Sequence, residues 1–258
     1  MLEIFVISAV AFAASLLTLF SGFGLGTLLM PVVALFFPLE VAIGMTAIVH
    51  LANNLFKVAI LGKHAVKQVL LRFGVAAVVA AFIGAWVLSL LAQSDDVINY
   101  IVFGWGLQTT LLNIIVGSLI LIFVLLEFSK TFAKIKLGPK YLPLGGTISG
   151  FFGGLSGHQG AFRSMFLLKA GLNKEQFIAT GVMVAVMVDV ARLTVYGKGL
   201  ANNYHAIDWS LVVVACLSAF TGAYLGKKVL QKVTINAVHL IVSVLLIIVA
   251  IGLMTGLI

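Results

Sequence analysis

The sequence is poor in charged residues and contains a single cysteine. Only 9% of its 258 residues are Asp, Glu, Lys or Arg, whereas a soluble domain carries about 25%. So few charges cannot cover a water-facing surface, which excludes an ordinary soluble enzyme and a disordered protein. The lone cysteine, Cys216, can form no disulfide within the chain, which excludes a disulfide-stapled scaffold.

The motifs of common catalytic and cofactor sites are also missing. The chain has no metal-ligand spacing of His and Cys, no H-E-x-x-H, no G-x-S-x-G and no P-loop for ATP. No nucleophile with a neighbouring base is evident either. The sequence therefore predicts a protein that is not an enzyme and that uses no metal and no cofactor.

Long apolar runs dominate the chain instead. Hydrophobic residues make up 62% of it, and its mean hydropathy is +1.21. A helix needs about 20 such residues to cross a hydrocarbon core, whereas the strands of a membrane barrel are alternating segments of about ten. We therefore predict an all-α polytopic membrane protein with eight long helices and two short half-helices, from apolar runs at 2–21, 26–37, 41–61, 69–91, 98–127, 141–156, 160–170, 175–197, 208–229 and 235–257.

Two of these runs, 26–37 and 160–170, are too short to cross a membrane alone. Each follows a glycine cluster, which reads Ser-Gly-Phe-Gly-Leu-Gly at 21–26 and Gly-Gly-Leu-Ser-Gly-His-Gln-Gly at 153–160. We interpret each short run as the return arm of a helical hairpin whose tip is broken or re-entrant.

The basic residues lie mostly in short loops. An excess of Lys and Arg is typical of cytoplasmic loops, so the net charge of +8 indicates a lipid bilayer as the partner and not nucleic acid. We expect a multi-pass protein of the cell (inner) membrane. The Lys and Arg residues place four loops in the cytoplasm, 62–72, 129–140, 169–174 and 227–234. Asp95 and Asp96, with no basic residue nearby, fit an outside loop at 92–98, and alternation places 198–207 and both termini outside.

The two halves of the chain come into register when the sequence is shifted by 135 residues. The matches include Ser21-Gly22 with Ser156-Gly157, Glu40 with Glu175, Asn54 with Asp189, Lys57 with Arg192, and Gly62-Lys63 with Gly197-Lys198. The last pair opens loops expected on opposite sides. The sequence thus predicts two inverted-topology repeats, 1–128 and 141–258, joined by a cytoplasmic linker at 129–140. Each repeat is a hairpin plus three crossing helices, an arrangement typical of transporters with a midplane site.

These features resemble the sulfite exporter TauE/SafE family. The resemblance covers nearly the whole chain and rests on the two glycine clusters, on Pro31 and Arg163 after them, and on the repeated architecture. Many members carry three glycines and a proline in the second half, where this chain has His-Gln-Gly at 158–160 and no proline after it. Members are associated with moving sulfite, organosulfonates or other small sulfur-containing anions, so the resemblance implies an anion transporter.

The hairpin tips are the first candidate site. A half-helix that begins at such a tip directs backbone N–H groups and the positive end of its dipole into the membrane centre, which favours an oxyanion. The alternative is close helix packing through small residues, which is also how we interpret Gly84 and Gly222. The candidate residues are Gly22, Gly24, Gly26, Gly157 and Gly160.

The second candidate site is a polar face of the expected helix 41–61. The spacing i, i+3, i+4, i+7 places four side chains on one face of a helix, namely His50, Asn53, Asn54 and Lys57. The equivalent run of the second half offers Asp189, Arg192 and Tyr196. Amide, imidazole and guanidinium groups can bind an oxyanion, with Asp189 serving coupling or charge balance. Alternatively, Lys57 and Arg192 snorkel to the surface, and Asp189 only neutralises Arg192.

The second tip adds His158, Gln159 and Arg163. A cation at membrane depth is costly unless it is paired or faces a wet cavity, so Arg163 is expected to be an anion ligand or a gate. The alternatives are an arginine bonded to loop carbonyls and a short helix that ends at the cytoplasmic surface. His158 is a hydrogen-bonding residue of the tip or a group that couples protons. Weaker candidates, which line the path or bond between helices, are Gln108, Thr109, Thr110 and Asn113.

The sequence thus favours a secondary transporter that exports a small sulfur-containing oxyanion, such as sulfite or an organosulfonate, by alternating access. A negative cell interior favours this direction by about 2.3 kcal/mol per charge and 100 mV. An anion channel and a non-transporting membrane subunit are the alternatives. The partners expected are the anion and the bilayer, and a homodimer and proton coupling are left open.

Overall fold

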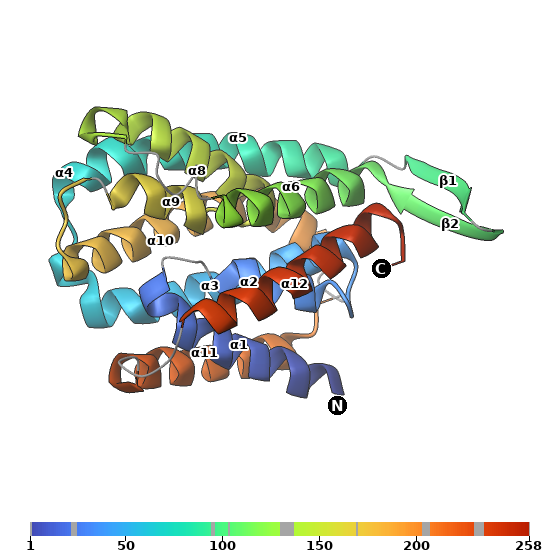
Figure 1. The fold of residues 1–258 in the computed structure, drawn as a ribbon, viewed down its shortest axis with the longest axis horizontal. Coiled ribbons are helices and arrows are strands. Elements are labelled where there is room, and N and C mark those ends of the chain that lie inside the picture. The colour runs from blue at the N-terminus through green and yellow to red at the C-terminus, as the bar shows by residue number, and fades with distance from the viewer. Residues whose placement is uncertain are drawn as a thin grey trace.

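The computed structural model describes residues 2–21, 25–93, 96–102, 104–129, 137–168, 170–202, 207–229 and 235–257. They form an elongated helical bundle from one end of which a β-hairpin projects (Figure 1). The first half contains α1 (Leu2–Ser21), α2 (Leu25–Val33), α3 (Leu39–Leu61), α4 (Lys67–Val69), α5 (Val75–Ala92), β1 (Val97–Val102), β2 (Trp105–Thr110) and α6 (Leu111–Phe128). The second half contains α8 (Leu142–Ser156), α9 (Gly160–Leu167), α10 (Lys174–Asn202), α11 (Trp209–Val229) and α12 (Ile235–Met254).

The short helices α2 and α9 lie directly after the two glycine clusters. Helix α8 ends at Gly157, whose φ of 80° lies in the left-handed region that glycine adopts without steric cost. The Gly157 N–H closes the last turn on the Gly153 carbonyl, and α9 begins three residues later at Gly160. The chain therefore turns inside the protein, and the residues of this turn are buried in the core.

Side chains cap the helices that enter from loops. Asn173 and Gln176 have the i, i+3 spacing of a capping box. They form one before α10, where each side chain accepts the other's backbone N–H at 2.9–3.1 Å. Asp208 caps α11 by accepting the Leu211 N–H at 3.0 Å. Donation from the Ser210 hydroxyl and from that N–H holds the pKa of Asp208 below its ordinary value.

The β-hairpin corrects the prediction of an all-α fold and of one helical run over 98–127. Strands β1 and β2 pair antiparallel from Val97 with Thr110 to Val102 with Trp105, and Gly104 at φ 82° makes the turn. The β-branched and aromatic residues of this stretch favour a strand, whereas the search for apolar runs merged it with the following helix α6. The hairpin is tied to α12 by the Tyr100 hydroxyl, which donates to the Thr255 carbonyl at 2.6 Å.

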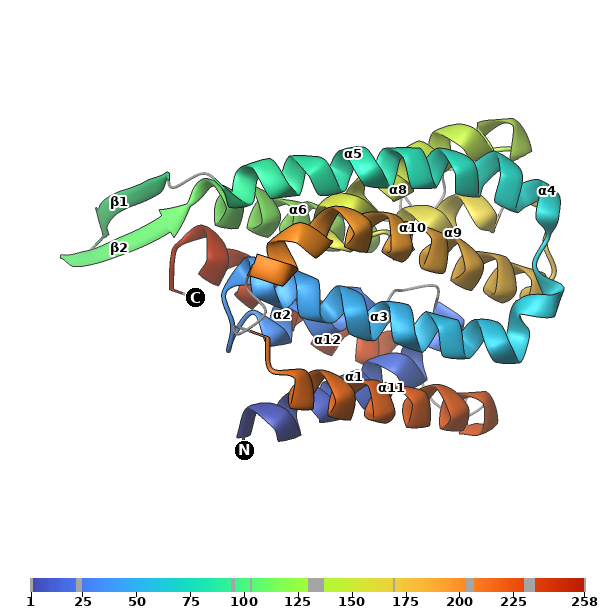
Figure 2. The ribbon, with the colours of Figure 1, turned by 180° about the vertical axis from the view of Figure 1, so that it is seen from behind.

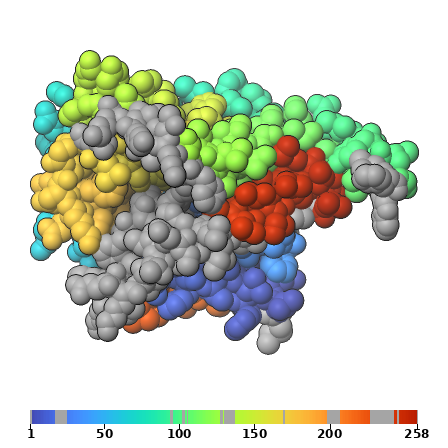
Figure 3. Space-filling view, viewed as in Figure 1, coloured from blue at the N-terminus to red at the C-terminus, as the bar shows by residue number. Residues whose placement is uncertain are grey.

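The main helix contacts join the two halves of the chain. Helix α5 packs on α8, α1 on α11, α3 on α10 and α6 on α12, the last pair lying side by side on the face drawn in Figure 3. Helix α8 contacts α5 through glycines. A β-carbon on Gly150 would lie 2.0 Å from the Ala77 carbonyl oxygen, so the two backbones can approach this closely only with glycine at this position. Gly84 of α5 and Gly222 of α11 approach a partner backbone in the same way, which confirms them as packing positions.

The outside of the bundle is largely apolar, whereas four charged residues are buried inside it, namely Lys57, Arg163, Asp189 and Arg192. Four described helical segments are long and apolar enough to cross a membrane: Leu39–His64, Lys67–Ala92, Lys174–Gly197 and Trp209–Gly226. Large apolar side chains are exposed along them and along α6 and α12, among them Leu55, Val79, Trp86, Ile122, Val213 and Ile248. This distribution suits lipid contact around a polar interior.

Candidate functional site

The polar face of α3 meets the polar face of α10 in the centre of the bundle. The two helices run antiparallel (Figures 1 and 2), because Asn54 contacts Asp189 whereas Val66, after α3, bonds to Thr180. The four predicted residues of α3 (His50, Asn53, Asn54 and Lys57) and the three of α10 (Asp189, Arg192 and Tyr196) are all buried. Lys57 and Arg192 are therefore packed inside the protein, so the alternative that they snorkel is wrong.

Asp189 is the hub of this centre. Its Oδ2 accepts from His50 Nδ1 at 2.7 Å and from Asn54 Nδ2 at 3.2 Å. Its Oδ1 accepts from Arg192 Nε at 3.0 Å, and Arg192 Nη2 lies 2.8 Å away. The ion pair expected from the i, i+3 spacing is thus present, and it extends to His50 and Asn54 on the other half of the chain. A carboxylate with 0% exposure that accepts from three groups rigidly couples α3 to α10.

Both hairpins reach this network. A β-carbon on Gly26 of α2 would lie 3.8 Å from the His50 ring, and one on Gly157 would lie 2.7 Å from Arg192 Nη1. Gly26 of α2 therefore borders His50 and Gly157 of the second tip borders Arg192, while Asp189 joins those two side chains. Gly22 and Gly24 lie outside the described residues.

The second tip buries the side chains of His158, Gln159 and Arg163. The Ser149 hydroxyl of α8 donates to the Gln159 carbonyl at 3.0 Å, which fixes the tip. Arg163 packs on α10, where a β-carbon on Gly181 would lie 3.5 Å from its Nε. Gly181 is about 12 Å along α10 from Asp189, so Arg163 contacts α10 at a different level from the Asp189 network. Because Arg163 is only 6% exposed, its side chain does not extend from α9 to the surface.

Positive charge is in excess in this interior. Among the described side chains, the buried basic residues are Lys57, Arg163 and Arg192, and the one buried acid is Asp189. Electrostatic interactions are strong in such a desolvated environment, so the arrangement attracts an anion. Guanidinium and amide groups can also donate hydrogen bonds to its oxygens.

One neighbour of the site carried no sequence signal. Ser15 of α1 donates to Asn53 Oδ1 at 2.9 Å. A hydroxyl in an apolar helix usually bonds within its own helix, so nothing in the sequence marked Ser15. Conversely, the weaker candidates Gln108, Thr109 and Thr110 belong to β2. There, Thr109 donates to the Leu253 carbonyl at 2.9 Å and Thr110 accepts the Asn113 N–H to cap α6.

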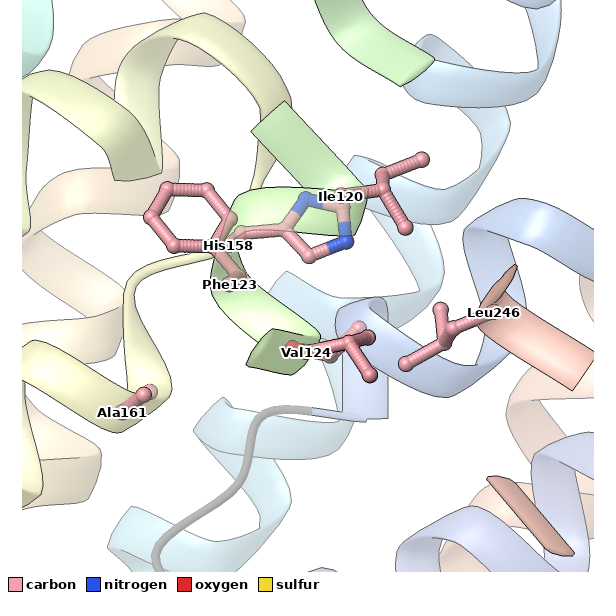
Figure 4. A pocket seen from close by; sticks show the side chains of 8 residues that line it. Ile120, Phe123, Val124, His158, Ala161 and Leu246 are labelled. Carbon is pink, nitrogen blue, oxygen red and sulfur yellow. The ribbon is translucent and has the colours of Figure 1, made fainter. Parts of the chain in front are cut away.

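A small pocket lies beside the second tip (Figure 4). Its volume is about 20 Å³, which is enough for a single water molecule. Thr27 of α2 and both His158 and Gly160 of the second tip border it, so both hairpins contribute to its wall. The rest of the wall comes from Ala161 of α9, Leu246 of α12, and Ile120, Phe123 and Val124 of α6.

Residues 7–253 match the family model described as Sulfite exporter TauE/SafE. The chain belongs to this family. The match covers nearly all of the 258 residues, which confirms the resemblance seen in the glycine clusters. Comparisons with curated proteins and with solved structures found no match. Members of the TauE/SafE family are membrane transporters and not enzymes, which agrees with the apolar helices and with the lack of catalytic motifs.

Proposed function

We propose that this TauE/SafE protein is a secondary transporter of the cell (inner) membrane that exports a small sulfur-containing oxyanion, such as sulfite or an organosulfonate. The observation that carries this proposal is the buried network of His50, Asp189 and Arg192, which joins the two hairpins. Around it lie two further cations, Lys57 and Arg163. In the interior that the structure describes, one acid lies among three basic residues, which favours the binding of an anion.

The helix contacts support two inverted repeats, 1–128 and 141–258, related by an approximate twofold axis. Asn54 and Asp189 are equivalent in the two repeats and hydrogen-bond to each other, and equivalent residues lie this close together only near such an axis. The equivalent helices α3 and α10 pack together, as do α6 and α12, whereas the contact of α1 with α11 is matched by that of α8 with α5. Each half thus completes the packing of the other, and the axis passes through the anion site.

The small volume of the pocket supports alternating access. An anion of sulfite size does not fit a space of about 20 Å³, so binding requires the hairpins to move relative to α6 and α12. With a negative interior, the membrane potential expels each negative charge with about 2.3 kcal/mol per 100 mV. A carrier of this kind exports anions without ATP.

The deciding experiment is substrate counterflow in proteoliposomes with labelled sulfite. We expect unlabelled sulfite inside the vesicles to accelerate uptake, because a carrier returns faster when it is loaded. A channel shows no such trans-stimulation, and a non-transporting subunit shows no uptake. Either result contradicts the proposal.

Arg163→Ala is expected to reduce sulfite counterflow at least about tenfold, because hydrogen bonds to a charged partner are worth about 1.5–3 kcal/mol. Lys140→Ala removes an exposed cation outside the bundle and is the matched control, with transport close to that of the wild type. Equal transport by the Arg163 variant, at equal amounts of inserted protein, excludes this arginine from the anion path.

The inversion predicts opposite sidedness for two loops. In a Cys216→Ala background, a cysteine at His64 should react with an impermeant maleimide from the cytoplasmic side only. A cysteine at Asn203 should react from outside only. Labelling of both positions from the same side refutes the inverted arrangement, whatever the transport assay shows.

A further inference from the structure

His158 is held in one orientation by its neighbours. Its Nδ1 lies 3.0 Å from the Ser156 carbonyl oxygen, and a carbonyl only accepts, so Nδ1 carries a hydrogen. The Ser156 hydroxyl, 3.2 Å from the same nitrogen, directs its own hydrogen to the Phe152 carbonyl. Phe123 stacks on the imidazole ring at 5.7 Å between centroids. The ring thus has a defined tautomer and little freedom to rotate.

The opposite ring nitrogen, Nε2, faces the pocket. His158 is only 4% exposed, and no atom of the described residues forms a hydrogen bond with Nε2. Figure 4 shows the ring with one nitrogen turned toward the space between Ile120, Val124 and Leu246. In a neutral imidazole whose Nδ1 carries the hydrogen, Nε2 is an acceptor. An unpaired acceptor at this depth is costly, so it is placed for a donor that enters the pocket.

The surroundings keep the ring neutral. Thr27, Phe123 and the aliphatic side chains that line the pocket carry no charge. Arg192 of α10 is a cation that lies against the tip, because a β-carbon on Gly157, the residue before His158, would lie 2.7 Å from Arg192 Nη1. A second proton on the imidazole would be both desolvated and repelled. Nε2 therefore keeps its lone pair.

We infer that His158 selects an oxyanion that retains a hydrogen-bond donor, so that the transported form of sulfite is the protonated monoanion, hydrogen sulfite. This inference rests on the proposed function and specifies its substrate. The buried cations bind the negative charge, and Nε2 accepts the O–H of the anion. A fully deprotonated oxyanion, or a sulfonate without a donor, places a lone pair against Nε2 and leaves the nitrogen unpaired. Sites built for a substrate hydroxyl reject analogues that lack it.

Gly160 supports the same orientation of the anion. It lines the pocket beside His158 and begins α9, an eight-residue helix whose first N–H groups point toward its N-terminus. Donors from the backbone suit the ionised oxygens of the anion, whereas the single acceptor suits its one protonated oxygen. The pocket thus offers complementary partners to both kinds of oxygen.

The experiment uses two sulfonates of equal charge and similar shape, 2-hydroxyethanesulfonate, which has an O–H donor, and propanesulfonate, which has a methyl group in its place. Purified protein should bind the hydroxylated anion at least about tenfold more tightly, because an unsatisfied buried acceptor costs about 1–3 kcal/mol. In His158→Phe, which keeps a ring to stack on Phe123, this ratio should fall to about one. Equal affinities in the wild type, or a preference that persists in the variant, overturn the inference.

A pH series with the wild type tests the same point without a substitution. Sulfite binding should weaken at least tenfold as the anion loses its last proton, while propanesulfonate binding stays constant across the same range. Sulfite binding that strengthens or stays level overturns the inference. Failure of every anion to bind or to exchange in counterflow instead contradicts the proposed function itself, so the two failures are distinguishable.

Discussion

Gly150→Leu is expected to prevent the bundle from assembling. A β-carbon at this position would lie 2.0 Å from the Ala77 carbonyl oxygen and 2.5 Å from its Cα. Both atoms belong to the backbone of α5, so the clash cannot be relieved by a rotamer change, and the two helices must separate. Because α5 and α8 come from different halves of the chain, their separation also opens the hairpin that carries His158. Overpacking costs about 1–3 kcal/mol in adaptable cores, and we expect more than about 3 kcal/mol here.

The measurement is the thermal unfolding of purified protein in detergent, together with its elution as a single species. Gly197→Ala is the matched control, because a β-carbon on this helical glycine meets nothing within 4 Å. Alanine there should leave stability unchanged or raise it slightly, since it is the better helix former. A Gly150 variant that elutes and unfolds like the wild type would show that α5 and α8 do not pack as closely as described.

Asp189→Ala is expected to cost about 3–5 kcal/mol of stability, the range found when one partner of a buried ion pair is removed. Its carboxylate accepts from His50, Asn54 and Arg192. Without it, Arg192, which is 1% exposed, becomes a buried cation with no counter-charge. Thermal unfolding should therefore shift strongly downward, whereas Glu40→Gln, which removes an exposed carboxylate at the start of α3, should cause almost no shift.

The double variant Asp189→Leu, Arg192→Met separates the structural role of the pair from its role in transport. Replacing both buried charges with apolar groups is often neutral, so the double variant should be more stable than Asp189→Ala. Its sulfite counterflow should nevertheless be lost, because the Arg192 guanidinium beside Gly157 is gone. Transport restored along with stability would mean that Arg192 serves only to balance Asp189.

Hydropathy and local patterns were sufficient to predict much of the molecule. The long apolar runs, the glycine clusters and the Asn173–Gln176 capping box each depend on interactions within a few residues or with lipid. The polar face of α3 also follows directly from helical spacing. Such features require no knowledge of which helix packs on which.

The β-hairpin could not be predicted in this way. Residues 97–110 directly precede the apolar helix α6, so a search for apolar runs merges the two segments, and hydropathy does not distinguish a helix from a strand. Their pairing depends on the turn at Gly104 and on contacts with the end of α12, such as Tyr100 with Thr255. The contact of Tyr100 with Thr255 spans 155 residues of sequence, so no local window contains it.

The amino-acid sequence by itself determined that this is a membrane protein, that a short apolar segment follows each of two glycine clusters and that the chain resembles the TauE/SafE family. Only the tertiary structure decided which buried charges meet, because Asp189 contacts His50 and Asn54 across 139 and 135 residues of chain. Periodicity shows which face of a helix is polar, but the partner of that face depends on the packing of both halves. Likewise, the direction of His158 Nε2 follows from Ser156 and Phe123 together, and only the folded chain brings those two around one ring.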